Sequence, residues 1–253
     1  MSNDNKSFKQ YCVVTAKALG MGVAEVIPGI SGGTIAFITG IYEDLINAIK
    51  SVNIEFAKKI LTLKWKEAFS IVHWKFLLAV AIGNLVAIKS LAKIISWLIH
   101  NHPTYLFAFF FGLILATIPI IARVVQKWDG KRISLAVIFT IGTYFFVGMV
   151  PVSTPNTPLF LFFSGMIAIS AMILPGISGS FILVILGKYL FILDAINHHD
   201  FASLAYLGAG ICVGILIFVR VLSYLFTKFH DTTLACLTGL VIGSLNKIWP
   251  WKE

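Results

Sequence analysis

Charged side chains are scarce in this chain. Only 12% of its 253 residues are Asp, Glu, Lys or Arg, whereas 58% are hydrophobic, and the mean hydropathy is +0.91. Such a composition excludes an ordinary soluble domain and a disordered chain. Apolar runs of about 20 residues, the length that an α-helix needs to cross a bilayer, recur along the sequence. The sequence therefore predicts an all-α polytopic membrane protein with a single membrane domain over residues 1–253.

Signatures of enzymatic chemistry are also lacking. The sequence has no P-loop and no His-Glu-x-x-His pair, and it shows no nucleophile–base set for hydrolysis. Its 3 cysteines lie far apart, without the spacing of a metal site or a disulfide. The run His198-His199-Asp200 is interpreted as a solvated turn, because no second group of ligands lies at metal spacing. We therefore expect a protein that is not an enzyme, binds no metal and needs no cofactor beyond a coupling ion.

Positive charges are unevenly distributed along the chain. The net charge is +9, and Lys and Arg crowd two connecting segments, at residues 50–75 and 123–132. The turns and loops at 100–103, 152–158 and 197–200 contain neither. This is the positive-inside pattern, which predicts a multi-pass protein of the cytoplasmic (inner) membrane with a cytoplasmic N-terminus. It also points to lipid rather than nucleic acid as the partner, with an amphipathic helix over 53–72 on the cytoplasmic surface.

One segment of the chain occurs twice. Residues 21–49 and 168–196 share a Pro-Gly-Ile-Ser-Gly core, and the second copy lies 147 positions after the first. Such a core inside apolar sequence breaks a helix and leaves backbone groups free at membrane depth. Two breaks at corresponding positions of two halves are a strong indication of a transporter's substrate site.

Each copy is too short for two full crossings. Residues 11–27 and 34–49 would form helices of about 25 Å, shorter than a hydrocarbon core of about 30 Å. We therefore expect a re-entrant helical hairpin in each half, with two fully spanning broken helices as the alternative. The similarity continues into the following spans, which predicts inverted repeats over about 11–122 and 159–250, joined by a span over 133–150. The second hairpin comprises 159–174 and 180–196, and the other expected spans are 74–99, 105–122, 201–225 and 233–249.

The two breaks supply hydrogen-bond donors for an anion. Backbone N–H groups at the start of a half-helix lack intrahelical partners and favour negative charge. Lys89 and Arg220 occupy equivalent positions in long spans, where a charge is costly and faces a cavity or a partner. Together these features predict an oxyanion site, with phosphate as the preferred ligand. The alternatives are close helix packing by Gly and Ser and snorkelling of the two cations. The candidate ligands in the breaks are Ser31, Gly32, Gly33, Thr34, Ser178, Gly179 and Ser180.

Glu25 is the acidic residue placed most clearly inside the apolar sequence. Its counterpart in the second copy is Met172, so the symmetry fails at this position. One interpretation is a structural ion pair with Lys89 or Lys17. The other is a coupling role, in which the carboxylate binds H⁺ or Na⁺ within the membrane.

The doubled motif resembles the PopT family of polyprenyl-phosphate transporters, formerly a domain of unknown function. The resemblance extends over essentially the whole chain. It implies recycling of undecaprenyl phosphate, the lipid carrier of cell-wall precursors, from the outer to the inner leaflet of a bacterial or archaeal cytoplasmic membrane. It also implies functional roles for the motif residues, which here are Glu25, Pro28, Gly29, Ser31, Gly32, Gly33, Pro175, Gly176, Ser178 and Gly179.

On this interpretation the phosphate binds between the two hairpin tips and the prenyl tail stays in the lipid. A secondary carrier of a small anion, a carboxylate or inorganic phosphate, would use the same donors. An intramembrane lipid phosphatase is a further alternative, and it would require a His–Asp or metal cluster near Ser31. The oligomeric state stays open.

Overall fold

The described structure, a computed structural model, comprises residues 7–27 and 29–251 of the chain. Within these ranges the chain forms 12 α-helices and no strand, which confirms the all-α class. Pro28, in the first predicted break, lies outside the described residues. Three helices of the described chain are long and apolar enough to cross a membrane, or up to 4 if the bent pair α10–α11 counts as one span.

Both hairpins contain one break more than predicted. The first consists of α1 (Phe8–Val26), α2 (Gly32–Ile38) and α3 (Tyr42–Ser51), and the second of α9 (Pro158–Ile173), α10 (Gly179–Ile185) and α11 (Tyr189–Asn197). The prediction of one helix after each break was wrong. Gly40 and Gly187 have φ of +72° and +66°, a left-handed conformation that glycine adopts at little cost and that ends an α-helix. As a result α11 is bent by 104° away from α10.

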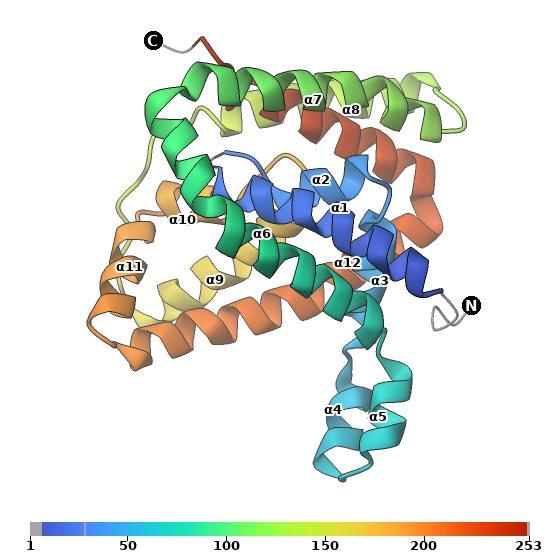
Figure 1. The fold of residues 1–253 in the computed structure, drawn as a ribbon, viewed down its shortest axis with the longest axis vertical. Coiled ribbons are helices and arrows are strands. Elements are labelled where there is room, and N and C mark those ends of the chain that lie inside the picture. Colours follow the sequence, from blue (N-terminus) through green and yellow to red (C-terminus); the bar gives the residue numbers. More distant parts are fainter. Residues whose placement is uncertain (1–6, 28, 252–253) are drawn as a thin grey trace.

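Four further helices complete the body. They are α6 (Trp74–Asn101), α7 (Pro103–Val124), α8 (Gly130–Phe146) and α12 (Phe201–Ser244). The two spans predicted over 201–225 and 233–249 are the two arms of α12, which is interrupted at Phe229 by non-helical dihedrals of φ −135° and ψ 44°. The second arm therefore runs back across the body (Figure 1).

Small residues set how each hairpin packs on its long helix. Gly83 of α6 lies so close to α1 that an added Cβ would meet Ala18 at 2.6 Å. Its counterpart Gly214 of α12 lies equally close to α9, where a Cβ would meet Met166 O at 2.7 Å. Membrane helices associate through such close backbone approach, because lipid provides no hydrophobic drive between them. The α1–α6 and α9–α12 pairs are therefore the same interface in two copies.

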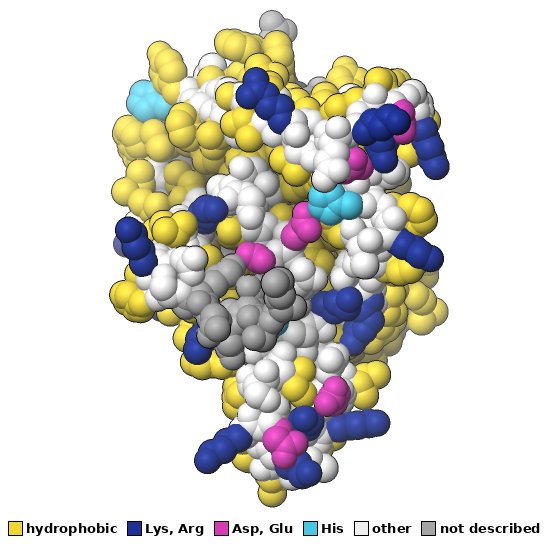
Figure 2. All heavy atoms as spheres, turned by 90° about the vertical axis from the view of Figure 1, so that its right-hand side faces the viewer, with side chains coloured by type: hydrophobic (Ala, Val, Ile, Leu, Met, Phe, Trp, Pro, Cys, Tyr) yellow, Lys and Arg dark blue, Asp and Glu magenta, His cyan; other side chains and the backbone are white. Residues whose placement is uncertain are grey.

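The two hairpins enter the body from opposite sides. In Figure 1, α1 and the end of α3 lie toward the right, beside the N-terminus, whereas α9–α11 begin and end on the left. Figure 2 shows the right-hand side of this view, and Lys and Arg side chains are spread over it. Opposite entry is the arrangement that inverted repeats require, and a basic face matches the positive-inside pattern.

Residues 54–71 form a projecting arm instead of the single surface helix predicted over 53–72. The arm consists of α4 (Ile54–Leu61) and α5 (Trp65–Ile71), which extend away from the body (Figure 1). The helix is divided at Leu63, a non-glycine residue with φ of +58°. Lys59 of α4 pairs with Glu55 in its own helix at 3.5 Å and with Glu67 of α5 at 3.4 Å, so one partly exposed ion pair joins the two helices. Ala68 is the single buried residue of α5, and α4 has none.

Lys188 fastens the loop before α9 to the second hairpin. Its side chain is fully buried and donates to Pro155 O at 2.8 Å and to Asn156 Oδ1 at 2.6 Å. A buried ammonium is tolerated only when such partners replace its water shell. Lys188 thus ties the loop that precedes α9 to the segment between α10 and α11.

The opposite entry of the hairpins predicts which residues each side of the membrane exposes. In a background without the native cysteines, we expect cysteines replacing Lys64 and Lys127 to react with a membrane-impermeant maleimide only from the cytoplasm. Cysteines replacing Ser153 and Asn197 should react only from outside. All four positions must react after permeabilisation, as a control. Labelling of positions 64 and 153 from the same side would contradict inverted repeats.

Candidate functional site

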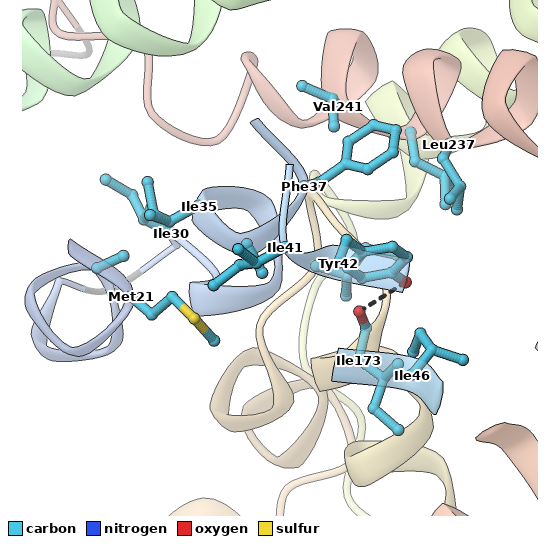
Figure 3. Packing of buried hydrophobic residues seen from close by; sticks show 14 of the residues in the cluster. Met21, Ile30, Ile35, Phe37, Ile41, Tyr42, Ile46, Ile173, Leu237 and Val241 are labelled. Atoms are coloured by element: carbon cyan, nitrogen blue, oxygen red, sulfur yellow. Dashed lines mark hydrogen bonds between the residues drawn. The ribbon is translucent and has the colours of Figure 1, made fainter. Parts of the chain in front are cut away.

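The tips of the two hairpins are in direct contact. The Ser31 hydroxyl donates to Met172 O at 3.3 Å, and the Gly176 N–H donates to Thr34 Oγ1 at 2.8 Å. In addition, the Tyr42 hydroxyl donates to Ile173 O at 3.0 Å (Figure 3). Side chains of the first break and of α3 thus satisfy backbone groups that the second break leaves free. The sequence predicted the residues at the tips, and the structure brings the tips together.

The contact depends on a glycine. A Cβ added at Gly33 would lie 2.9 Å from Ile173 O and 3.1 Å from Met172 O, so no larger residue fits without a shift of backbone. Ser31 and Thr34 on either side are each 1% exposed. The first tip is therefore packed against the second break, and its two hydroxyls are already engaged.

An internal carboxylate occupies the start of α2. The Gly32 N–H donates to Glu25 Oε1 at 3.1 Å, and the Gly33 N–H donates to Ser31 Oγ at 3.1 Å. The predicted ion pair of Glu25 with Lys17 or Lys89 is absent from the described residues. Lys17 instead donates to Thr39 O at 2.6 Å, at the C-terminal end of α2 where a cation is favoured. The first half-helix start therefore binds a carboxyl group that belongs to the protein itself.

The second tip lacks such a carboxylate. Met172 stands where the first copy has Glu25, and Ser178 makes no side-chain capping hydrogen bond at the start of α10. The Ser178 and Ser180 hydroxyls lie 2.8 Å apart and share one hydrogen bond. Two adjacent hydroxyls can turn together toward a common acceptor. The second tip thus presents the donor groups that are not already committed to an anion.

Lys247, beyond the end of α12, lies against both tips and was not predicted. Its ammonium lies 4.3 Å from the centre of the Phe181 ring in the first turn of α10. Its Cγ lies 2.9 Å from the position of a Cβ added at Gly29, in the first break. The internal symmetry could not reveal this residue, because the repeat places it opposite Ala116. The sequence did contain one indication of its importance, because Lys247 is a charged residue inside the predicted span 233–249.

Lys89 and Arg220 lie apart from these contacts. Lys89 is exposed on α6, two positions from Ala87, which faces α1, so about 200° of helix rotation separates the two side chains. The Arg220 guanidinium donates to Leu216 O in its own helix. In the described part of the chain neither cation bonds to a hairpin tip. Their role in binding anion stays a prediction.

Ser31 lies in a run, Gly29–Gly33, that fits the letters of the hydrolase motif Gly-x-Ser-x-Gly. In that motif a histidine must contact the serine hydroxyl to activate it. Here Ser31 Oγ contacts the Gly33 N–H and Met172 O, and no histidine or carboxylate of the described chain bonds to it. No group of three or more His, Cys, Asp and Glu side chains in the described ranges could hold a metal ion. Ser31 therefore has the hydrogen-bond partners of a structural or ligand-binding hydroxyl, and none of the described contacts of a catalytic serine.

Two apolar halves with broken helices, whose breaks meet at the centre of the molecule, define a membrane transporter. The family model named VCA0040-like, undecaprenyl phosphate translocase-like, matches residues 21–253. The chain belongs to this family, and the resemblance inferred from the doubled motif is confirmed.

Two curated relatives carry the name polyprenyl-phosphate transporter. The protein of Vibrio cholerae serotype O1 is 40% identical over 243 residues, which cover 96% of this chain and 79% of the relative. That of Staphylococcus aureus is 31% identical over 252 residues, covering 92% of this chain and 84% of the relative. No solved structure matches the chain.

Substitution of Gly33 tests the contact between the tips. We expect Gly33→Ala to lower the free energy of unfolding by about 1–3 kcal/mol, because the methyl group forces the two breaks apart. Gly112→Ala is the matched control, since nothing lies within 4 Å of a Cβ added in the middle of α7. That change should leave stability unaltered or raise it by up to about 1 kcal/mol. Thermal unfolding in detergent measures both, and equal stability of the two variants would show that the tips do not touch.

Proposed function

We propose that this protein is a transporter, and not an enzyme, that carries polyprenyl phosphate across the cytoplasmic membrane. Undecaprenyl phosphate, moved from the outer to the inner leaflet, is the proposed substrate and direction. Family membership and the names of the two relatives support the substrate class. The observation that carries the site is the hydrogen bond from the Gly32 N–H to Glu25, since it identifies a backbone donor in the tips that already binds the oxygen of an acidic group.

The proposed headgroup site lies at the second tip. Ser178, Gly179 and Ser180 supply hydroxyl and backbone donors, and Lys247 supplies a positive charge beside them. A phosphate binds most strongly through charge-assisted hydrogen bonds, and away from water these are stronger than at a surface. The absence of a carboxylate from this tip favours an external anion there, whereas the first tip repels one for as long as Glu25 stays bound.

Exchange of Glu25 for phosphate would extend the site to the first tip. If Glu25 binds H⁺ or Na⁺, its charge is neutralised and its hold on the Gly32 N–H weakens. The Gly32 N–H then becomes available to the headgroup, whereas Ser31, Gly33 and Thr34 could contribute only if their own contacts were exchanged as well. This exchange would couple transport to an ion gradient. Moving one negative charge inward costs about 2.3 kcal/mol per 100 mV of a membrane potential that is negative inside. A co-transported cation would offset this cost, as would a protonated headgroup or a gradient of the lipid between the leaflets.

The surrounding helices fit a lipid substrate. Inverted halves would allow the headgroup to face each leaflet in turn while most of the prenyl chain remains in the bilayer. The arm over 54–71 would lie in the cytoplasmic interface, with Trp65 and Phe69 toward the acyl chains and its lysines toward anionic headgroups. In this structure Lys89 and Arg220 lie away from the tips. They therefore remain candidate ligands only for a headgroup that is moving between the tips and the membrane surface.

Replacement of Lys247 tests the headgroup site. We expect Lys247→Gln to slow transport of labelled undecaprenyl phosphate into proteoliposomes about 10- to 100-fold, because a charge-assisted bond worth about 1.5–3 kcal/mol is lost. Lys93→Gln, at an exposed position of α6, is the control and should transport normally. Lys89→Gln and Arg220→Gln are measured in parallel. If Lys247→Gln transports normally while Lys89→Gln and Arg220→Gln lose transport, then Lys89 and Arg220 bind the headgroup, as the symmetry predicted, and Lys247 does not.

The same liposomes separate the competing functions. Uptake of inorganic phosphate or a small carboxylate, without movement of the lipid, would favour the small-anion carrier. Release of phosphate from the lipid would favour the phosphatase.

Glu25→Gln tests the coupling role. We expect this variant to bind substrate but to lose the dependence of transport on the proton or sodium gradient, because its neutral side chain has no charge to exchange. Glu43→Gln is the control, since Glu43 also lies in the first hairpin but pairs with His230 at 3.0 Å near the basic face. A full, wild-type response of Glu25→Gln to both gradients would leave Glu25 with a purely structural role.

A further inference from the structure

The kink of α12 creates an apolar groove. Because the dihedrals of Phe229 turn the helix, its two arms face each other across an angle, and a groove of about 320 Å³ lies between them. The α12 positions along the groove follow one another at helical spacing on a single face of both arms. Nearly all the lining is apolar, and it includes Phe139, Leu174, Leu222, Leu225, Cys236 and Leu240.

The groove extends to the second hairpin tip. Leu174, one of its lining residues, caps the end of α9 and directly precedes Pro175 in the second break. Leu240 lines the groove, and its carbonyl oxygen lies 2.8 Å from the position of a Cβ added at Gly176. A chain molecule lying in the groove would therefore have one end beside the second break, where Leu174 stands four positions before Ser178.

We propose that the groove binds the first isoprene units of the prenyl chain, next to the phosphate. This inference rests on the proposed function, and it changes the expectation that the whole tail stays outside the protein. The remainder of the chain would leave the groove for the bilayer. The groove would then decide which lipid phosphates are carried, while the tip binds the headgroup that all of them share.

Selectivity for a prenyl chain follows from shape. Lipid tails are as apolar as the groove, so transfer from bilayer to groove gains nothing from the hydrophobic effect and depends on van der Waals packing. An isoprene unit has a methyl branch and a planar double bond. It fills a wide groove lined by phenyl and leucyl groups more completely than a linear saturated chain does. A phospholipid acyl chain is therefore the weaker occupant.

Two native cysteines provide a matched test. Cys236 lines the groove, whereas Cys212 lies exposed on the same helix outside it. We expect Cys236→Trp, which fills the groove, to reduce transport of undecaprenyl phosphate at least fivefold, and Cys212→Trp to transport like the wild type. Normal transport by a folded Cys236→Trp protein would refute binding of the prenyl chain in the groove and would leave the proposed function intact.

A second measurement does not depend on transport or on the folding of a bulky variant. In a Cys12→Ser, Cys212→Ser protein, modification of Cys236 by an apolar thiol reagent should slow at least fivefold in the presence of farnesyl phosphate. Dodecyl phosphate, which has a linear saturated chain of the same length, should protect much less, and inorganic phosphate not at all. Equal protection by farnesyl and dodecyl phosphate would refute selectivity for isoprene units. No protection by either would refute the site.

Discussion

The structure depends on one constraint, that backbone groups freed by a broken helix at membrane depth must find partners inside the protein. Lipid offers none, and each unpaired group costs several kcal/mol. Here side chains of the first half supply partners for backbone groups of the second half. The Gly176 N–H reaches Thr34, the carbonyl of Met172 accepts from Ser31, and the carbonyl of Ile173 accepts from Tyr42. The two hairpins must therefore meet at their tips, and the long helices pack around that contact.

The two halves have the same helix arrangement around their breaks, but they place different charged side chains at the two tips. At the start of α2 the protein binds its own carboxylate, Glu25, whereas the second copy has Met172 at that position and Lys247 beside the tip. Under the proposed mechanism the second tip is open to an external anion, whereas the first tip releases its Gly32 N–H only when Glu25 is neutralised. This difference would couple movement of the headgroup to an ion gradient, which two identical sites without a carboxylate could not do.

The kinked helix α12 contributes both to the apolar groove and to the surroundings of the proposed headgroup site. Its two arms provide the apolar groove, its second arm carries Leu240 against Gly176, and the segment after it brings Lys247 to both tips. The first half has separate helices, α6 and α7, where the second has the two arms of α12. One interrupted helix therefore joins the part that would recognise the chain of the substrate to the part that would recognise its phosphate.

The sequence by itself determined the class, the duplication and the position of the main breaks. Composition sets the environment, and a Pro-Gly-Ile-Ser-Gly core interrupts a helix through local backbone chemistry, so neither depends on distant residues. The breaks at Gly40 and Gly187 were missed because a lone glycine is common within membrane helices and acts as a terminator only when its φ is positive.

Tertiary structure alone decided which polar groups meet. Lys89 has a symmetric partner in the sequence, yet it points away from the tips, because close packing at Gly83 fixes the rotation of α6 against α1. Lys247 has no symmetric partner, yet it reaches both tips, because the kink at Phe229 turns the second arm of α12 back across the body. Helix rotation and kink direction are set by contacts between segments far apart in the chain, and no local pattern encodes them.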